Sequence, residues 1–190
     1  MLEDAEISRR LATFPLQTIP RQGLRPAAVL VPLYVKDGEE WTLLTRRTDH
    51  LNHHRGEISF PGGAMNATDE NLTATALRES EEEMGIRPRD VEVLGRLDDF
   101  YSVHGYHVVP FVGRIPHPYR YRVNSDEIAE VIELPLSQLR DPAVYHEEDW
   151  TFQGRVHPVS FYTVGRHVVW GLTAAILKQF FFRVYGDSAA

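Results

Sequence analysis

Four glutamates crowd into the segment LRESEEEMG, residues 77–85. If this segment is helical, each residue advances by about 100° around the axis. Relative to Glu79, Glu82 then lies at about −60° and Glu83 at about +40°. Glu81 lies at about 200°, on the other side of the helix. Three of the four carboxylates therefore project from one side.

Carboxylates this close to one another repel, at a cost of a few tenths of a kcal/mol per pair. An acidic run is often only a solvated helix face, and that alternative stands for the isolated segment. A hard divalent cation such as Mg²⁺ offers another explanation, because it prefers oxygen ligands and shares them with water and substrate phosphates. Arg78, one turn before Glu82, would pair with Glu82 and fix its rotamer.

The register of the surrounding residues resembles the Nudix hydrolase signature, G(x5)E(x7)REUxEExGU, in which U is a bulky aliphatic residue. The matching residues are Glu70, Arg78, Glu79, Glu82, Glu83, Gly85 and Ile86. Ala64 stands where the signature has its leading glycine, just after Gly62 and Gly63, so Asp69 competes with Glu70 in the alignment. Ser80 replaces the aliphatic residue.

A second resemblance lies just upstream, in residues 43–63. The segment LLTRRTDHLNHHRGEISFPGG is similar to LLTxR[SA]xxxRxxxGxxxFPGG, the pattern of the coenzyme A pyrophosphatase branch of that family. The matching residues are Leu43, Leu44, Thr45, Arg47, Gly56, Phe60, Pro61, Gly62 and Gly63. Thr48 replaces Ser or Ala. Asn52 stands where the pattern has an arginine, although Arg55 lies only three residues further along the chain. The later segment WGLTAAIL also resembles that branch.

The resemblance implies metal-dependent hydrolysis of the pyrophosphate bond of coenzyme A, which yields 3',5'-ADP and 4'-phosphopantetheine. It implies Mg²⁺ or Mn²⁺ as the cofactor, with Glu79 and Glu83 as metal ligands and Glu82 as a ligand or general base. Arg78 belongs to the same catalytic motif. Glu127, in a later loop, is a second candidate for the base, with an ordinary surface acid as the alternative.

The segment before the helix carries the densest local positive charge in an acidic chain, and coenzyme A has an additional 3'-phosphate to bind. Glycines there would let the backbone approach a phosphate. The predicted substrate-binding residues are Arg46, Arg47, His53, His54, Arg55, Gly62 and Gly63. For the two histidines, the alternative is a polar loop without substrate contact.

Two other functions remain open. One is a Nudix enzyme for a different nucleoside diphosphate derivative, such as ADP-ribose or a dinucleotide. This alternative remains because Asn52 stands where the coenzyme A pattern has an arginine. The other is a ligand sensor on the same fold that has lost catalysis. Loss of the acidic helix face would mark such a sensor, and Glu79, Glu82 and Glu83 are all present.

Composition narrows the class of partner. The chain has 190 residues, a net charge of −7 and no cysteine, which excludes disulfides, thiolate metal sites and a cysteine nucleophile. An acidic chain of this kind favours a small-molecule substrate over nucleic acid or a membrane surface. We expect a cytoplasmic protein, because its charged start does not resemble a secretory signal, and a homodimer stays open.

The elements that must position these residues alternate between strands and helices, so the predicted class is α/β with a mixed sheet. The resemblance specifies a Nudix α/β/α sandwich and one domain over residues 1–190, with the Nudix box at about 62–86 and the coenzyme A motif at about 43–63. The predicted strands are 27–35, 41–47, 91–102, 107–115 and 157–164, and the predicted helices are 72–84 and 168–186. Residues 127–139 are predicted to be a strand that leads into a short helix. Asp69 or Asn71 would cap the helix at 72–84, and Gly85 would end it.

Overall fold

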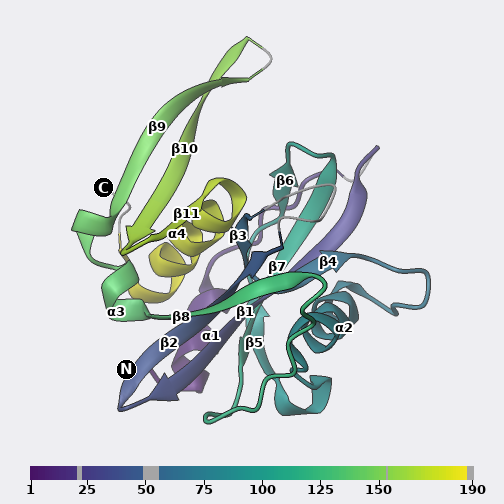
Figure 1. Cartoon of the computed structure of the whole chain (residues 1–190). Helices are drawn as coiled ribbons and strands as arrows, with labels where there is room; N and C mark the ends of the chain where they lie inside the picture. The colour runs from purple at the N-terminus through teal and green to yellow at the C-terminus, as the bar shows by residue number, and fades with distance from the viewer. Residues whose placement is uncertain (21–22, 49–55, 153, 188–190) are drawn as a thin grey trace.

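The chain folds around a mixed β-sheet with helices on both faces. A computed structural model describes residues 1–20, 23–48, 56–152 and 154–187. Helix α2 (Leu72–Met84) covers one face, and α1 (Asp4–Thr13) and α4 (Gly171–Tyr185) cover the other (Figure 1). The predicted α/β/α sandwich with a mixed sheet is confirmed.

The main sheet has the order β3-β2-β1-β7-β5, with β4 on β1, β6 on β7 and β8 on β2. Its strands are β1 (Arg25–Lys36), β2 (Glu39–Arg47), β3 (Ile58–Ser59), β4 (Gly62–Ala64), β5 (Glu92–Arg96), β6 (Phe100–Ser102), β7 (Tyr106–Arg114) and β8 (Ile128–Pro135). Strands β1 and β7 run parallel, whereas β1 and β2 form an antiparallel hairpin. Asp37 and Gly38 turn this hairpin with φ of 52° and 79°, which suits a two-residue hairpin turn.

A separate three-stranded antiparallel sheet follows in the chain. It consists of β9 (Tyr145–Phe152), β10 (Arg155–Val164) and β11 (His167–Trp170), in the order β11-β10-β9. Short helical segments precede it: α3 (Leu136–Leu139) and the 3-10 turn Pro142–Val144, while a further 3-10 turn, Pro88–Asp90, follows α2. The β9–β10 hairpin projects from the rest of the molecule (Figure 1).

Helix α2 has the predicted boundaries, and its two ends show why. The Asn71 side chain accepts a hydrogen bond from the Ala74 N–H at 2.9 Å, which satisfies one of the free donors of the first turn. Gly85 ends the helix with φ of 71°, and its N–H donates to the Glu81 carbonyl at 2.8 Å. Between these caps the helix buries Leu72, Ala76 and Met84 against the sheet.

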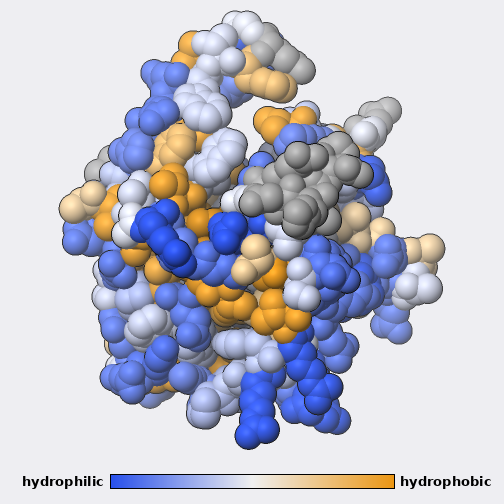
Figure 2. Space-filling view, in the orientation of Figure 1, coloured by the Kyte–Doolittle hydropathy of each residue, from blue (hydrophilic) through white to orange (hydrophobic). Residues whose placement is uncertain are grey.

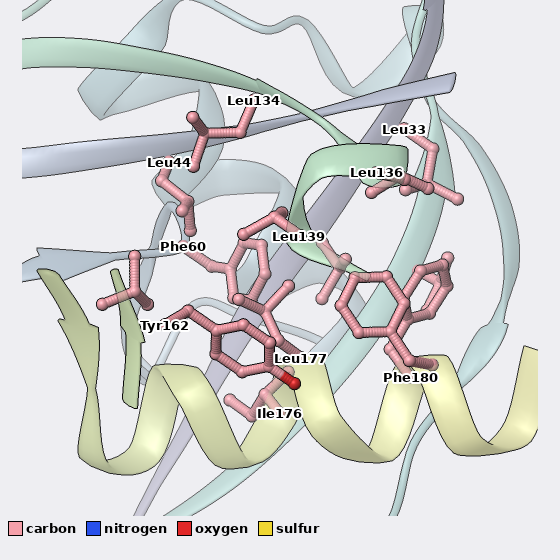
Figure 3. Close-up of a cluster of buried hydrophobic side chains, with 14 of the residues drawn as sticks. Leu33, Leu44, Phe60, Leu134, Leu136, Leu139, Tyr162, Ile176, Leu177 and Phe180 are labelled. Atoms are coloured by element: carbon pink, nitrogen blue, oxygen red, sulfur yellow. The ribbon is translucent and has the colours of Figure 1, made fainter. Parts of the chain in front are cut away.

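The larger hydrophobic core lies on the opposite face, between the sheet and α4. Figure 3 shows Leu177 and Phe180 of α4 directed toward Phe60 and Leu139, with Tyr162 of β10 in the same cluster. A large apolar side chain contributes roughly 1.5–3 kcal/mol when it is fully buried. This core therefore fixes the second sheet and the C-terminal helix to the main sheet.

Two predicted elements differ from the structure, and several observed elements were not predicted. The strand predicted at 91–102 is two strands, β5 and β6, with Leu97–Asp99 between them. The helix predicted at 168–186 begins only at Gly171, because residues 168–170 pair with β10. Helix α1 and strands β3, β4, β9 and β11 were not predicted. Within the described part of the chain, no helix has the length and apolar content to span a membrane.

A buried carboxylate ties the N-terminal segment and α4 to the sheet. Asp98 accepts hydrogen bonds from the Arg183 guanidinium, from the Gln179 side chain at 2.7 Å and from the Gln17 N–H at 2.8 Å. Asp98 and Arg183 are 7% and 6% exposed. Because both charges are almost out of water, each depends on the other.

We predict that Asp98→Ala lowers the free energy of unfolding by about 3–5 kcal/mol, because it leaves the Arg183 charge buried without its partner. Urea denaturation measures the loss. Asp149→Ala, which removes an exposed acid, is the control and should change stability by less than about 0.5 kcal/mol. The double variant with Arg183→Met should recover part of the loss. A loss of under about 1 kcal/mol for Asp98→Ala would contradict the role assigned to the pair.

Candidate active site

Strand β2 separates two neighbouring arginines. Side chains alternate along a strand, so Leu43 and Arg47 point to the face covered by α2, whereas Leu44 and Arg46 point to the α4 face. Arg47 Nη1 donates to Glu83 Oε1 at 3.2 Å, and its Nη2 lies 3.7 Å from Glu127 Oε2. Arg47 thus joins a glutamate of the helix to a glutamate of the later loop.

Glu83 is the most deeply buried carboxylate of the site, with 2% of its surface exposed. Its Oε2 accepts a hydrogen bond from the Gly62 N–H at 3.3 Å. Burial raises the pKa of Glu83 from 4.5 to about 7, although Arg47 and the Gly62 N–H act against the rise. The charges of Glu79 and Glu127 raise it further. A cation bound next to Glu83 would lower the free energy of its ionised carboxylate.

Glu79 lies directly over the backbone of β4. A Cβ built on Gly63 would lie 2.6 Å from the Glu79 carboxyl carbon, so only glycine leaves room for this carboxylate. Burial raises the pKa of Glu79, and Arg78, whose Nη1 lies 2.9 Å from Glu79 Oε1, opposes the rise. Glu79 and Glu83 therefore both reach β4, one at Gly63 and the other at Gly62.

The other glycine of the pair has a different role. A Cβ on Gly62 would lie 2.4 Å from the Ala28 carbonyl oxygen and 2.6 Å from Val29 Cα, in the neighbouring strand β1. Its φ of 159° lies at the limit of what other residues adopt. Gly62 therefore allows β4 to approach β1 closely enough for its N–H to meet Glu83.

Arg78 is held in place by Asp69, a residue that the motif comparison left in competition with Glu70. Arg78 Nε donates to Asp69 Oδ1 at 2.8 Å and its Nη2 to Asp69 Oδ2 at 3.0 Å, while Glu70 is exposed. Thr75 Oγ1 also donates to Asp69 at 2.9 Å. Arg78 holds the pKa of Asp69 well below its usual range. Asp69 was not predicted as a site residue, and its place one residue before the motif's glutamate was the only signal.

Glu82 lies at the exposed edge of the cluster. Its side chain is 55% exposed, and Arg78 Nη1 donates to Glu82 Oε2 at 3.0 Å. The expected pairing of Arg78 with Glu82 is thus present. Because the same Nη1 also contacts Glu79, one guanidinium orients both carboxylates. Glu82 is open to water, whereas Glu83 is not.

Glu127 enters the site from the loop before β8. The Asn124 side-chain amide donates to Glu127 Oε1 at 3.1 Å, and the Asn124 N–H donates to the Glu83 carbonyl at 2.9 Å. The loop is therefore fastened to the end of α2. The Glu127 side chain is 40% exposed. Glu127, the residue proposed from the sequence, is therefore an accessible carboxylate beside the buried ones.

Arg46 belongs to a different cluster. Its Nε donates to Glu130 at 3.1 Å, and Glu130 also accepts from Arg166 at 2.6 Å and contacts His167 Nε2 at 3.0 Å. The structure therefore does not bring Arg46 together with the glutamates of α2. The predicted substrate contacts His53, His54 and Arg55 lie outside the described residues.

The donor set suits a hard divalent cation shared with a substrate. All the candidate ligands are carboxylate oxygens, which Mg²⁺ and Mn²⁺ accept. Among the described residues, no three acidic or histidine side chains already converge as a complete metal site. Arg78 and Arg47 instead supply the positive charge next to Glu79 and Glu83. One or two carboxylates completed by substrate phosphate and water is a common arrangement for Mg²⁺.

Comparison with known proteins points to one family. The model of the NUDIX domain matches residues 24–153. The "Uncharacterized Nudix hydrolase NudL" of Escherichia coli (strain SMS-3-5 / SECEC) is 44% identical over 155 residues, which cover 82% of this chain and 80% of the relative. The protein of that name from Shigella boydii serotype 18 (strain CDC 3083-94 / BS512) has the same identity and coverage.

Solved structures resemble the fold. A MutT/nudix family protein from Enterococcus faecalis has a TM-score of 0.57 at 18% identity, over 98% of this chain and 71% of its own. A binary complex of the Caenorhabditis elegans Ap4A hydrolase has a TM-score of 0.51 at 18% identity, over 58% of this chain and 80% of its own. At such identities the likeness concerns the fold.

We predict that Glu83→Gln stabilises the metal-free protein at pH 8 by up to about 3 kcal/mol. The folded pKa of about 7 exceeds the unfolded value of 4.5, so stability is lost as the pH rises between them and Glu83 ionises. The two proteins should converge near pH 5. Urea denaturation with a chelator at both pH values measures this, and Glu81→Gln, on the exposed side of α2, should show no such dependence. A Gln variant that is less stable at pH 8 would contradict the argument.

We predict that Gly63→Ala displaces the Glu79 carboxylate, because the new methyl group would occupy its place. Binding of Mn²⁺, followed by calorimetry, should weaken at least about tenfold, as misplaced site groups commonly cost 10–100-fold. The melting temperature should change little, since a flexible side chain can move away. Unchanged Mn²⁺ affinity would show that Glu79 does not need this position.

Proposed function

Because this chain belongs to the NUDIX domain family, and is thus a Nudix hydrolase, we propose that it hydrolyses the pyrophosphate bond of coenzyme A. The products are 3',5'-ADP and 4'-phosphopantetheine. One observation carries the proposal: the Glu79 carboxylate lies against Gly63, and the Glu83 carboxylate accepts a hydrogen bond from the Gly62 N–H. These two glycines end the segment that resembles the coenzyme A branch.

Carboxylates and guanidinium groups divide the work in this proposal. Glu79 and Glu83 would hold Mg²⁺ or Mn²⁺, and Glu82 would contribute as a ligand or as a base. The metal supplies neutralisation of phosphate charge and makes hydroxide more available at neutral pH. Arg78 keeps Glu79 and Glu82 oriented, since it is itself anchored by Asp69. Arg47 provides a cation beside the diphosphate.

The chemical step needs a group that accepts a proton from the attacking water. Water forms a new bond to one phosphorus, the bond from that phosphorus to the bridging oxygen breaks, and the bridging oxygen leaves with the electron pair. Glu82 and Glu127 are the two candidates for the base because both are accessible: their side chains are 55% and 40% exposed. Glu83, at 3%, is too enclosed to exchange protons freely.

Recognition of coenzyme A also requires positive charge for the 3'-phosphate. Arg47 is the described arginine of the motif that faces the carboxylates, and we assign His53, His54 and Arg55 to the same task from their place in the sequence. Arg46 contacts Glu130 on the other face of the sheet. Arg46 is therefore not among the phosphate contacts that we propose. We also propose that the whole chain is one Nudix domain that acts on a small molecule.

A second candidate substrate is another nucleoside diphosphate derivative, such as ADP-ribose or a dinucleotide. Asn52 favours it, because this residue replaces the arginine of the coenzyme A pattern. A catalytically silent sensor ranks below both, since the carboxylates of α2 are present and placed together.

A substrate panel tests the proposal. With Mg²⁺ or Mn²⁺, we expect coenzyme A to yield 3',5'-ADP and 4'-phosphopantetheine by mass spectrometry, and to exceed ADP-ribose, dinucleotides and nucleoside triphosphates in kcat/KM. Glu83→Gln should lower kcat by on the order of 10²–10³, the loss usual for one electrostatic group of a site. No product from coenzyme A would overturn the substrate, and no product from any compound would favour the sensor.

Two further variants separate a base from a ligand. Glu82→Gln and Glu127→Gln each remove one candidate for the base. Substitution of the true base should lower kcat by a factor on the order of 10²–10⁴ and leave the Mn²⁺ affinity unchanged. Substitution of a metal ligand should lower both kcat and the Mn²⁺ affinity. Loss of metal binding in Glu82→Gln would assign Glu82 to the metal and leave Glu127 as the base.

A further inference from the structure

The β9–β10 hairpin is anchored at one end and free at the other. At its base, Tyr162 packs edge-on to Phe181 of α4, with the ring centroids 6.2 Å apart. Every described residue of its outer part, 146–152 and 154–158, is exposed. We call this outer part the arm. It forms the upper left lobe of the molecule in Figure 2. A two-stranded hairpin with water on both sides is marginally stable by itself.

One face of the second sheet carries a band of aromatic side chains. Trp150 lies 5.4 Å from Trp170 and 5.9 Å from Phe161, measured between ring centroids. Although these rings pack together, Trp150 and Trp170 remain 43% and 37% exposed. Phe152, at 44%, and Val168, at 43%, extend the band along the same face, because side chains alternate along each strand. Large apolar groups gathered in this way mark interaction sites.

The outer edge of β9 does not suit pairing with another copy. Glu147, Glu148 and Asp149 follow one another in the middle of the strand. Two β9 strands paired edge to edge about a two-fold axis would bring these acids together, and like charges opposite one another destabilise a sheet. Charged edge strands of this kind block edge pairing. A partner must therefore use the aromatic face.

The charges beside the aromatic band are arranged for a two-fold partner. In the hairpin, Trp150 is opposite His157, while Phe152 is opposite Arg155, toward the tip. Glu148 lies two residues from Trp150 in the other direction, toward the body, and both Glu148 and Arg155 are exposed. A two-fold axis that crosses the strands at the level of Trp150 would bring Glu148 to the level of the partner's Arg155, one strand to the side, and Arg155 to the level of the partner's Glu148.

We propose that the aromatic face of the arm binds a second copy of this chain, with the two arms stacked face to face and antiparallel. A two-fold interface requires a self-complementary surface, and the order acid, aromatic band, base along the arm provides it. Each Trp150 would pack against the aromatic band of the partner. The distal hairpin would then have a packed face in place of a solvated one.

The area available sets the strength of this association. At roughly 200 Å² per aromatic side chain, the three exposed rings and Val168 offer about 300 Å² of apolar surface per copy. A stable interface buries about 800 Å² per partner. The polar rim must supply the remainder, so the dimer is reversible, with a dissociation constant on the order of micromolar.

Sedimentation velocity of the full chain from about 1 µM to about 300 µM tests the proposal, a range that brackets the expected affinity. The weight-average sedimentation coefficient should rise toward that of a dimer with concentration. Trp150→Glu should abolish the rise, and Tyr101→Ser, which removes a 52% exposed aromatic from β6, should leave it unchanged. A monomer throughout, or a dimer that survives Trp150→Glu, would overturn the proposal.

A charge exchange distinguishes this arrangement from any other contact of the arm. Glu148→Arg alone and Arg155→Glu alone should each weaken the dimer at least tenfold, because each places like charges together across the axis. The double variant restores the opposite pairing and should recover most of the affinity. Circular dichroism of each variant checks that the hairpin persists. If the double variant is as weak as the single ones, the antiparallel two-fold arrangement is wrong.

Discussion

The burial of the Glu83 carboxylate is the constraint on which the rest of the site depends. An ionised group removed from water is tolerated only where hydrogen bonds and opposite charge compensate for the lost hydration. Here the Arg47 guanidinium and the Gly62 N–H provide this compensation incompletely, which is why the pKa rises to about 7. A metal ion and a polyphosphate would complete it. The burial that makes an ionised Glu83 unfavourable in the protein alone thus makes this end of α2 receptive to cations.

That constraint explains the position of several surrounding groups. Gly62 lets β4 lie against β1, so that its N–H reaches Glu83, and Gly63 leaves space for Glu79. Gly85 ends α2, and a Cβ there would lie 2.8 Å from Arg122 Cβ, so this glycine leaves room for the segment between β7 and β8 to lie against the end of the helix. That segment carries Asn124, whose N–H donates to the Glu83 carbonyl. Backbone geometry at the three glycines therefore delivers Glu127 and β4 to the same end of α2.

The sequence was sufficient for the features that local rules govern. Asn71 and Gly85 define the ends of α2, and the helical spacing of Glu79 and Glu83 was enough to place both on the side that reaches β4. Glu82 was predicted in the same sector, and the structure places it at the exposed edge of that sector because Arg78 holds it there.

Features that depend on contacts distant in the chain were not accessible. The Arg78 guanidinium binds Asp69 and not Glu70, and this contact depends on how the loop before α2 folds back onto the helix. Strand β9 has three consecutive acids and a weak strand pattern, and it forms because β10 pairs with it along its whole length. Arg46 and Arg47 looked equivalent as cations of one segment. The alternation along β2 assigns Arg47 to the α2 face and Arg46 to Glu130 on the α4 face, so the main sheet keeps the chemistry of the glutamates separate from the face that supports the second sheet and its arm.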